Sequence, residues 1–336
     1  MTVSELSMPN LPVGFSAKAV EPDADSAAVT ALCEATAIAD DGVSDVTLQA
    51  VRESYNAPGF DPQTDARLVM DTGGRLVGVV EFYDSDEQHV APFVFIRVLR
   101  RALASGVAEA LLAWAAERGR RAADLATPDL RVALHSNTSG VNRAMQEIFE
   151  RSGWQFERMN WEMEIDLEEE PSVPPLRSPL QLRTARRGED EPAIYQAEME
   201  AFADHYGFMP RPYETWLQIA TMVFPYDPTL WFLAVDNDEI AGISLCLLDQ
   251  LGRTDSGYVG TLGVRPAWRG RGVGLSLLRH SFAELYRRGK RRIALHVDSQ
   301  SLTGATRLYE RGGMHVVRES RAYEHVLRKG RELRPT

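Results

Sequence analysis

Five of the six residues from Arg269 to Gly274 ("RGRGVG") are arginine or glycine, and they follow an apolar segment that ends at Pro266. Glycines at a turn from strand to helix remove the Cβ atoms that keep a ligand away from the backbone, and the free N–H groups at a helix start point outward together. The helix dipole and the flanking guanidinium groups attract an anion, and each charge-assisted hydrogen bond contributes about 1.5–3 kcal/mol. These residues therefore predict a cradle for a pyrophosphate.

Two other phosphate-binding turns do not fit this run. A P-loop ends in Gly-Lys-Ser or Gly-Lys-Thr, and the run contains no lysine. A dinucleotide-binding turn requires Gly-x-Gly-x-x-Gly, and the glycines at 270, 272 and 274 have a different spacing. The ligand of the cradle has to be inferred from the elements around it.

A cradle of this kind needs a strand before it and a helix after it, and the pattern predicts both. The segment "YVGTLGV" (258–264) has the composition of a strand, and apolar residues recur at helical spacing between Gly272 and Arg288. In the same half, helices are also predicted at 191–203, 213–222 and 303–311, and strands at "LQLRTA", "LWFLAVD", "IAGISLCLL", "RIALHVD" and "MHVVRESRAYEHV".

The first half of the chain repeats this order of elements, with strands predicted at "ARLVMD", "RLVGVVEFY", "FVFIRVL", "LRVALHS" and "WQFERMNWEMEIDL". Between the halves, an acidic run and four prolines in "DLEEEPSVPPLRSPLQLR" interrupt all periodicity. We predict an internal duplication with a period of roughly 150 residues, too long for a solenoid. The expected fold class is α/β, with two tandem domains at 1–168 and 181–336, a linker at 169–180, and a central mixed sheet flanked by helices in each domain.

The turn and the residues after it resemble the GNAT acetyltransferase superfamily. The coenzyme A loop of that family, Gln/Arg-x-x-Gly-x-Gly/Ala, is matched by Arg269, Gly272 and Gly274, with Val264 and Pro266 placed before it. Downstream, "VDSQSLTGATRLYERGGM" resembles the family's second signature, in which a helix of small residues ends in Leu-Tyr before a glycine and a final strand. Two ordered motifs at the proper separation carry the resemblance for the second half.

The resemblance implies an acetyl-CoA-dependent N-acetyltransferase in which the acceptor amine attacks the acetyl carbon directly. A splayed strand would pair with the pantetheine arm and the loop would hold the pyrophosphate, so that positioning and oxyanion stabilisation provide most of the catalysis. Tyr309 would donate a proton to the departing thiolate, with packing in the core as its alternative role. The residues assigned to the coenzyme are Leu262, Gly263, Val264, Arg269, Gly270, Arg271, Gly272, Val273, Gly274 and Ser301.

The general base is less defined by the resemblance. Many family members carry a carboxylate on the strand entering the loop, whereas this strand holds Tyr258 and Thr261. The segment "EMEAFADHYGFMPRPYETW" lies where the family usually lines its acceptor pocket, and its Glu200 and His205 are the alternatives for the base, His205 having an ordinary pKa suited to base work at neutral pH. Asp204, which could also serve, Tyr206 and Tyr258 are expected to contact the acceptor.

The first half lacks both functional features of the second. Aligning Leu111-Leu112 on Leu277-Leu278 places Leu103 at Arg269 and Ala108 at Gly274, and retains only Gly106, at Gly272. Aligning "FERSGW" on "YERGGM" places Phe149 at Tyr309. We expect this half to be a scaffold, a regulatory site or part of the acceptor pocket, and drift after duplication explains the losses equally well.

Tandem GNAT chains of this kind resemble the mycothiol synthase relatives of actinobacteria along nearly the whole chain. The "FADHYG" segment departs from the His-Pro-Glu-Gln-Gly pattern of mycothiol synthase, so an amine-bearing small molecule is the broader expectation for the acceptor. The alternatives are mycothiol synthase itself, a protein lysine acetyltransferase and a non-catalytic acyl-CoA sensor. A sensor would keep the cradle but would have no need of Tyr309.

Composition sets limits on partners and location. The net charge of −11 divides into −15 up to Glu170 and +4 after it, which excludes nucleic acid as a partner and suits a small phosphorylated ligand in the second half. No apolar run is long enough to cross a membrane and the N-terminus lacks a secretory signal, so we expect a cytoplasmic monomer or homodimer. Cys33 and Cys246, in apolar surroundings, predict buried thiols with neither disulfide nor metal.

Overall fold

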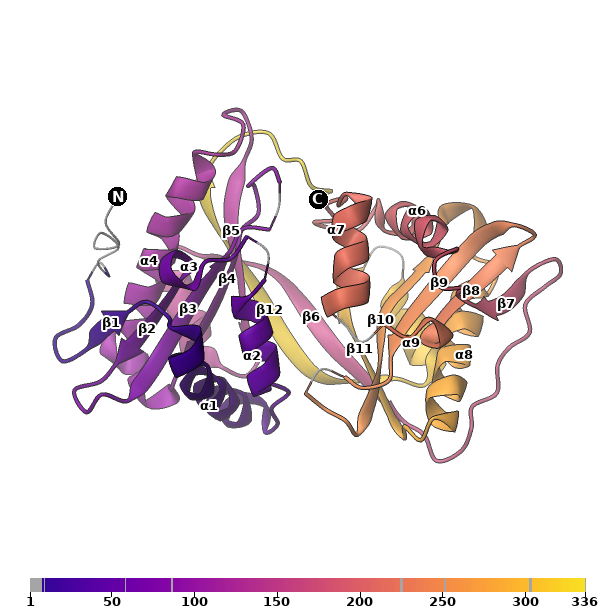
Figure 1. Cartoon of the computed structure of the whole chain (residues 1–336), viewed down its shortest axis with the longest axis horizontal. Helices are drawn as coiled ribbons and strands as arrows, with labels where there is room; N and C mark the ends of the chain where they lie inside the picture. The colour runs from indigo at the N-terminus through magenta and orange to yellow at the C-terminus, as the bar shows by residue number, and fades with distance from the viewer. Residues whose placement is uncertain are drawn as a thin grey trace. The chain divides into compact units, whose positions relative to one another are not determined.

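The structure is a computed structural model that describes residues 8, 10–57, 59–85, 87–223, 226–250, 252–301 and 304–335 (Figure 1). Contacts between residues divide the chain into two compact units. Unit 1 consists of Met1–Met159 and Arg318–Leu333, and unit 2 consists of Asn160–Val317 and Arg334–Thr336. In the described part of the chain, no helix is long and apolar enough to span a membrane.

Unit 1 is a mixed sheet with helices on both faces. Its strands run in the order β1 (Ser16–Lys18), β2 (Ala66–Met70), β3 (Leu76–Tyr83), β4 (Phe93–Val98), β5 (Val132–Ser139) and β12 (His315–Arg328). Helices α1 (Pro22–Asp41) and α2 (Leu48–Tyr55) pack on one face, and α4 (Val107–Ala123) and α5 (Arg143–Arg151) pack on the other. The short helix α3 (Pro62–Asp65) leads into β2. Strands β4 and β5 are parallel, and their neighbours are antiparallel.

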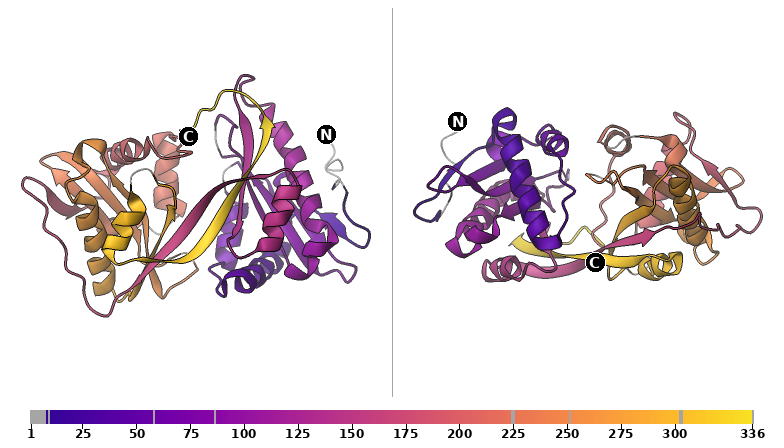
Figure 2. Two further views of the ribbon diagram at one scale, coloured as in Figure 1. Left: turned by 180° about the vertical axis from the view of Figure 1, so that it is seen from behind. Right: turned by 90° about the horizontal axis from the view of Figure 1, so that it is seen from below.

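Unit 2 repeats this architecture, as each unit taken separately in Figure 2 shows. Its strands run in the order β6 (Gln155–Asp166), β11 (Arg292–Asp298), β10 (Ser256–Val264), β9 (Glu239–Leu247), β8 (Trp231–Asp236) and β7 (Gln181–Thr184). Helices α8 (Val273–Arg287) and α9 (Ala305–Gly312) pack on one face, and α6 (Glu191–Phe202) and α7 (Tyr213–Gln218) pack on the other. Alternation along the strands builds the two faces: Phe232 and Ala234 of β8 meet the α8 core, and Trp231 and Leu233 meet the α6 core.

The predicted fold class is confirmed, and the predicted strands and helices lie within a few residues of those observed. One helix differs, because the segment expected at 213–222 is α7 followed by a π-helical turn at Ile219–Val223. Residue 303, the expected start of the last helix, lies outside the described residues. Both thiols are buried, as expected, and burial raises the pKa of Cys33 to about 12 and that of Cys246 to about 11.

Each unit takes a strand from the other half of the sequence. Ser320–Arg328 of β12 pair with β5 in unit 1, and residues 160–166 of β6 pair with β11 in unit 2. Contacts between residues thus assign most of β6 to unit 2 and most of β12 to unit 1. The domain boundaries expected from the sequence, at 168 and 181, stay a prediction. The exchange brings Glu162 and Glu164 of β6 into unit 2.

The segment at 168–180 has no helix or strand and packs along α8. The buried hydroxyl of Ser276 donates a hydrogen bond of 2.8 Å to the carbonyl of Pro174, and Leu176 packs against the apolar core under α8. Near the end of α8, Arg287 forms an ion pair of 3.1 Å with Glu170. These contacts attach the expected linker to unit 2.

Strands β10 and β11 pair only at their first residues. Their parallel register extends from Ser256 opposite Arg292 to Tyr258 opposite Ala294, although β10 continues to Val264 and β11 continues to Asp298. Beyond that point β10 remains paired with β9, and β11 remains paired with β6. The facing edges of the two strands therefore have backbone N–H and C=O groups that do not pair across the gap.

Helix α6 lies directly on β10 at Gly263. A Cβ atom at this glycine would lie 2.9 Å from Cε2 of Phe202 and 3.0 Å from Cβ of Ala201. A Cβ atom cannot approach another Cβ atom so closely, and the Cβ of Ala201 is fixed to the helix backbone. The missing side chain at Gly263 thus sets the distance between α6 and the sheet.

We expect Gly263→Ala to lower the free energy of unfolding by about 1–3 kcal/mol, because the added methyl group must displace the end of α6. Equilibrium urea denaturation followed by tryptophan fluorescence measures this loss. The matched control is Gly260→Ala on the same strand, where the nearest backbone atom is 3.3 Å away; we expect a change below about 1 kcal/mol there. Equal losses in the two variants would contradict this account of α6.

Candidate active site

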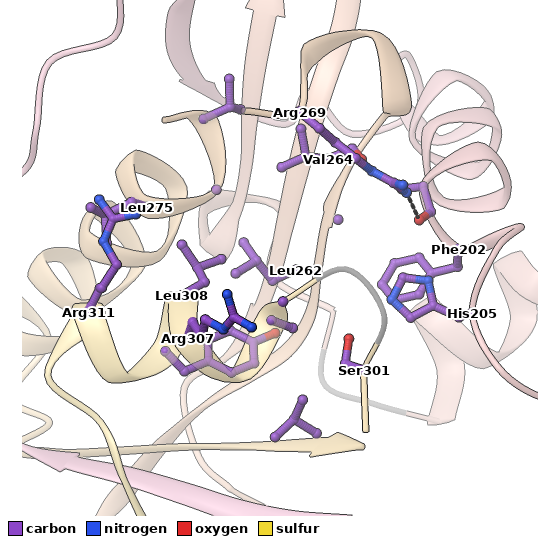
Figure 3. Close-up of a pocket in the computed structure, with 18 of the residues that line it drawn as sticks. Phe202, His205, Leu262, Val264, Arg269, Leu275, Ser301, Arg307, Leu308 and Arg311 are labelled. Carbon is purple, nitrogen blue, oxygen red and sulfur yellow. Dashed lines mark hydrogen bonds between the residues drawn. The ribbon is translucent and has the colours of Figure 1, made fainter. Parts of the chain in front are cut away.

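A pocket of about 550 Å³ in unit 2 opens where β10 and β11 diverge. It is bounded by the end of α6, the last residues of β10 and β11, the loop before α8, and helix α9 (Figure 3). The expected coenzyme residues line it, with the exception of the exposed Arg271: these are Leu262, Gly263, Val264, Arg269, Gly270, Gly272, Val273, Gly274 and Ser301.

The loop before α8 presents backbone N–H groups to this pocket. Gly270 and Gly272 have left-handed backbones, with φ of 73° and 83°, and Gly272 is the N-cap of α8. The first bond of the helix runs from the N–H of Ser276 to the carbonyl of Gly272, at 3.1 Å. In the described part of the chain, the N–H groups of residues 270–275 have no acceptor. Side chains other than glycine would strain this turn, so the residues fit the phosphate cradle expected from the sequence.

Arg269 does not direct its charge at the cradle. Its Nη1 and Nη2 contact the carboxylate of Asp204 at 2.5 and 3.1 Å, its Nη2 also donates to the carbonyl of Ala201 at 2.9 Å (Figure 3), and its Nε donates to the carbonyl of Val264 at 3.1 Å. The hydrogen bonds from Arg269 hold the pKa of Asp204 below its usual value. This side chain therefore ties the end of α6 to the end of β10.

Two further arginines, which the sequence analysis did not assign, also line the pocket. Arg307 and Arg311 lie one turn apart on α9, on the opposite side of the pocket from Phe202 and His205 (Figure 3). Within the described ranges, neither guanidinium group forms an ion pair. Their spacing in "RLYER" around Tyr309 is the signal that could have identified them, since residues four apart share one helix face.

Tyr309 faces the pocket from α9, between Arg307 and Arg311. Its side chain is 7% exposed, and burial raises the pKa of Tyr309 to about 12, with a smaller contribution from Tyr258. Its hydroxyl has no hydrogen-bond partner among the residues that the structure describes. A buried phenol of this kind keeps its proton throughout the neutral range.

His205 lines the opposite side of the pocket, just beyond α6. Its ring contacts that of Phe202, with 4.6 Å between centroids, and its Nδ1 is 3.5 Å from Oδ1 of Asp204 without a hydrogen bond to any described residue. Burial is the main cause that lowers the pKa of His205. The imidazole is therefore neutral at pH 7 and able to accept a proton.

The other residues expected on the acceptor side do not line the pocket. Glu200 forms a bidentate ion pair with Arg265, at 2.7 and 3.0 Å. The carboxylate of Asp204 is bound by Arg269, and Tyr206 lies in the turn after α6. Tyr258 is half-buried next to the pocket, where its hydroxyl is 2.9 Å from Nδ1 of the pocket-lining His296.

His296 lines the pocket and was not singled out from the sequence. It lies in the strand "RIALHVD", which is otherwise apolar between its charged ends and in which the neighbouring Leu295 and Val297 pack under α8. A polar residue at an alternate position of a strand lies on the face opposite the apolar one. That alternation was the available signal for His296.

The described residues of unit 1 form no equivalent cradle. Gly106 still caps α4 with a left-handed backbone, but a Cβ there would lie 3.2 Å from Cγ of Pro12, and Leu11 packs against the apolar core beneath α4. Leu103 is buried in the same core, and the ring of Phe149 stacks on Tyr323 with 4.8 Å between centroids. The N-terminal segment therefore covers the start of α4, and both aligned positions serve packing.

Unit 1 contains a group of metal-ligating side chains on its sheet. Ligand atoms of His135, Glu157 and Glu324 lie within 4.8 Å of one another. Both oxygens of Glu324, however, accept hydrogen bonds of 2.8 Å from Arg131. A guanidinium group already balances this carboxylate, so we assign the group to an ion-pair network.

Comparison with known sequences identifies acetyltransferases in each case. Residues 192–314 match the family described as Acetyltransferase (GNAT) family. A mycothiol acetyltransferase from Actinosynnema mirum is 31% identical over 255 residues, which span 74% of this chain and 80% of that protein. A mycothiol acetyltransferase from Geodermatophilus obscurus is 32% identical over 197 residues, which span 55% of this chain and 59% of that protein.

Solved structures extend the likeness to the whole chain. A GCN5-related N-acetyltransferase from Sphaerobacter thermophilus superposes with a TM-score of 0.84 and 32% identity, covering 96% of this chain and 99% of that one. A tandem GNAT protein from the clavulanic acid biosynthesis pathway superposes with a TM-score of 0.69, covering 94% of this chain and 100% of that one. At 14% identity, the second likeness concerns the fold alone.

Replacement of Arg269 and replacement of Arg307 should have different effects on stability and on acetyl-CoA binding. Arg269→Ala removes a tie between α6 and β10, so we expect lower stability, by about 1–3 kcal/mol, together with weaker acetyl-CoA binding. Arg307→Ala removes a charge from the pocket wall, so we expect about tenfold weaker acetyl-CoA binding with unchanged stability. Thermal unfolding and titration calorimetry separate the two effects. An Arg269→Ala protein of normal stability would show that the tie does not support the fold.

We expect titration calorimetry to give one acetyl-CoA per chain, because the start of α4 is covered and the start of α8 is not. Gly272→Val introduces a branched side chain at a left-handed position and should abolish this binding. The matched change in unit 1, Gly106→Val, should leave the stoichiometry and affinity for acetyl-CoA unchanged. Two sites per chain would contradict the assignment.

Proposed function

The chain belongs to the GNAT acetyltransferase family, and from this premise we propose that unit 2 transfers the acetyl group of acetyl-CoA to the amine of a small molecule. The observation that carries the proposal is the arrangement of the pocket between β10 and β11. Unpaired N–H groups of residues 270–275 lie at its edge, and a protonated tyrosine, Tyr309, lines its wall. An anionic coenzyme and a leaving group that needs a proton require such an arrangement.

The residues of unit 2 fit the coenzyme expected from the family. Acetyl-CoA supplies an activated acyl group and a thiolate leaving group. The N–H groups of residues 270–275 would hold its pyrophosphate with the help of Arg307 and Arg311, and the unpaired edge of β10 at Leu262–Val264 would hold its pantetheine arm. These contacts would place the acyl group near Tyr309 and away from bulk water.

Tyr309 is proposed as the general acid. Because burial raises its pKa to about 12, the phenol keeps its proton at neutral pH, where a free thiol has a pKa near 8.5. A donor whose pKa exceeds that of the acceptor transfers its proton only when closely aligned, and the burial of Tyr309 in α9 restricts its orientation. Tyr309 would thus protonate the thiolate as it departs.

The end of α6 is proposed as the acceptor side. His205 and Phe202 line the pocket there, and the neutral imidazole of His205 could contact the amine or take its proton. We propose structural roles for Glu200 and Asp204, because their carboxylates are bound by Arg265 and Arg269. The acceptor would then meet an aromatic and largely uncharged wall.

The identity of the acceptor is the finer part of the proposal. Relatives of this chain are named mycothiol acetyltransferase, so the acceptor of that enzyme is the specific second candidate. Against it, the "FADHYG" segment, which includes Phe202 and His205, differs from the pattern that we associate with mycothiol synthase. An amine-bearing small molecule of broader class is therefore the primary proposal.

The proposal is tested by thiol release from acetyl-CoA with a panel of amines: an aminoglycoside, glucosamine, a cysteine-containing pseudodisaccharide, spermidine and a lysine peptide. Turnover of a small amine supports the proposal, and preference for the pseudodisaccharide supports the second candidate. Turnover of the lysine peptide alone would replace both by a protein acetyltransferase. Tight acetyl-CoA binding without turnover of any amine would indicate a sensor.

Tyr309→Phe removes one hydroxyl and almost no volume, so stability should change little. Loss of a general acid should slow single-turnover acetyl transfer by about 10²–10⁴-fold, while acetyl-CoA affinity remains within about twofold of wild type. The control is Phe149→Tyr, the aligned position in unit 1, which should not add activity. A Tyr309→Phe rate within about threefold of wild type would remove this residue from the mechanism.

A further inference from the structure

Three polar side chains from adjacent strands of unit 2 meet beside the pocket. Tyr258 lies on β10, His296 on β11 and Glu162 on β6, where Glu162 stands directly opposite His296 in the antiparallel register. They occupy the face of the sheet away from α8, since Leu295 and Val297 point into the core under that helix. None of these three residues is the proposed acid, Tyr309, or one of the bases expected from the sequence, His205 and Glu200.

The contacts among them define a chain of proton-accepting groups. The hydroxyl of Tyr258 is 2.9 Å from Nδ1 of His296, and Nε2 of His296 is 3.7 Å from Oε2 of Glu162. A carboxylate beside Nε2 stabilises a proton on that nitrogen, which leaves Nδ1 to accept the proton of the tyrosine. At 3.7 Å the contact is electrostatic and not a hydrogen bond, and the charge of Glu162 favours the tautomer in which His296 can act as a base toward Tyr258.

The carboxylate at the end of this chain is held rigidly. Glu162 is only 4% exposed, and its Oε1 accepts a hydrogen bond of 2.9 Å from Nε2 of Gln250. Arg253 lies 3.6 Å from the same oxygen and forms a closer ion pair, at 2.6 Å, with Glu164. A buried carboxylate in such a network keeps a fixed position, as the partner of a catalytic histidine must.

The chain borders the pocket at its other two members, the half-buried Tyr258 and its partner His296. The His296 side chain is 51% exposed and lines the pocket together with Tyr309. Tyr258 is close enough to Tyr309 for its charge to contribute to the raised pKa of that residue. Strand β10 carries no carboxylate between Ser256 and Val264, so a proton acceptor beside the acyl group has to come from another strand.

We propose that Tyr258, His296 and Glu162 form the base that deprotonates the acceptor ammonium group. One N–H bond of the ammonium breaks and an O–H bond forms at Tyr258, whose own proton moves to Nδ1 of His296. The imidazolium that results is balanced by the negative charge of Glu162, and the neutral amine keeps the electron pair that attacks the acyl carbon. This inference rests on the proposed function and assigns its base to these three residues in place of His205.

His205 is the competing candidate, and its surroundings are less suitable. Its neighbouring carboxylate, Asp204, is already bound by Arg269, so an imidazolium at this position would lie close to a second cation. Burial is the largest cause of the lowered pKa of His205; the charge of Asp204 raises this pKa, and the charge of Arg269 offsets part of that effect. Tyr258 and Glu162 contact His296, and Arg253 lies 3.6 Å from Glu162. The other titratable or charged groups that line the pocket with His296 are His205, Arg269, Asp298, Arg307, Tyr309 and Arg311.

The test uses His296→Ala in the full chain, with the panel amine that wild type acetylates fastest as acceptor. At pH 7 we expect single-turnover acetyl transfer to slow by about 10²–10⁴-fold, with acetyl-CoA affinity within about threefold of wild type. The deficit should shrink as pH rises, because more of the amine is already neutral, and added imidazole should restore part of the rate. Merely structural damage would respond to neither. The matched control is His315→Ala, at an exposed position of β12, which should behave as wild type.

Two variants test the remaining members of the chain. Tyr258→Phe should slow transfer by about tenfold or more, since the relay through the hydroxyl is lost. Glu162→Gln should cause a smaller loss, because the amide keeps the shape of the carboxylate but not the charge that balances the imidazolium. A deficit that depends on pH and recovers with imidazole in His205→Ala, but not in His296→Ala, would overturn the proposal in favour of His205.

The outcomes separate this inference from the proposed function. If wild type acetylates an amine and His296→Ala remains within about threefold of it, the relay is wrong and the proposed function stands. If His296→Ala loses coenzyme affinity and thermal stability together and imidazole restores nothing, the residue is structural and the relay is again wrong. If wild type acetylates no amine in the panel, the proposed function itself fails, and this inference fails with it.

Discussion

Divergence of β10 and β11 is the constraint on which the site in unit 2 depends. After Tyr258 and Ala294 the two strands follow different partners, β9 and β6, and their facing edges lose their mutual hydrogen bonds. Unpaired backbone groups in a sheet normally carry a free-energy cost, which a ligand with hydrogen-bonding groups along its length can offset. The pocket, the start of α8 and the residues of α9 all lie around this gap.

Close packing around the gap depends on two missing side chains and on one arginine. Gly263 lets α6 lie directly on β10, Gly274 lets Leu308 of α9 approach α8 within 3.1 Å of the missing Cβ, and Arg269 joins the end of α6 to the end of β10. The charge of Arg269 matches the family motif, but its hydrogen bonds satisfy the carbonyl groups of Val264 and Ala201. Arg269 therefore has a structural role at this position of the motif, in addition to the charge that it carries.

The two units have the same fold but different residues where the long helix, α8 or α4, begins. In unit 2 a cradle of glycines leaves the start of α8 open, whereas in unit 1 Pro12 lies against Gly106 and the core beneath α4 includes Leu103. Phe149 replaces a pocket-lining tyrosine and stacks on Tyr323, so that an aromatic pair fills the position. The same residues that depart from the two motifs thus fill the core of unit 1.

Periodicity, the linker composition and the two motifs determined the α/β class, the duplication, the order of the elements and the location of the cradle, because each of these depends on neighbours in the sequence. The direction of a side chain depends on neighbours that are distant in the sequence. Arg269 was expected to bind phosphate, but only tertiary structure places Asp204 and the carbonyl of Ala201 beside it. In the same way Glu162, from the first half of the chain, meets His296 because β6 pairs with β11, and no local pattern specifies that pairing.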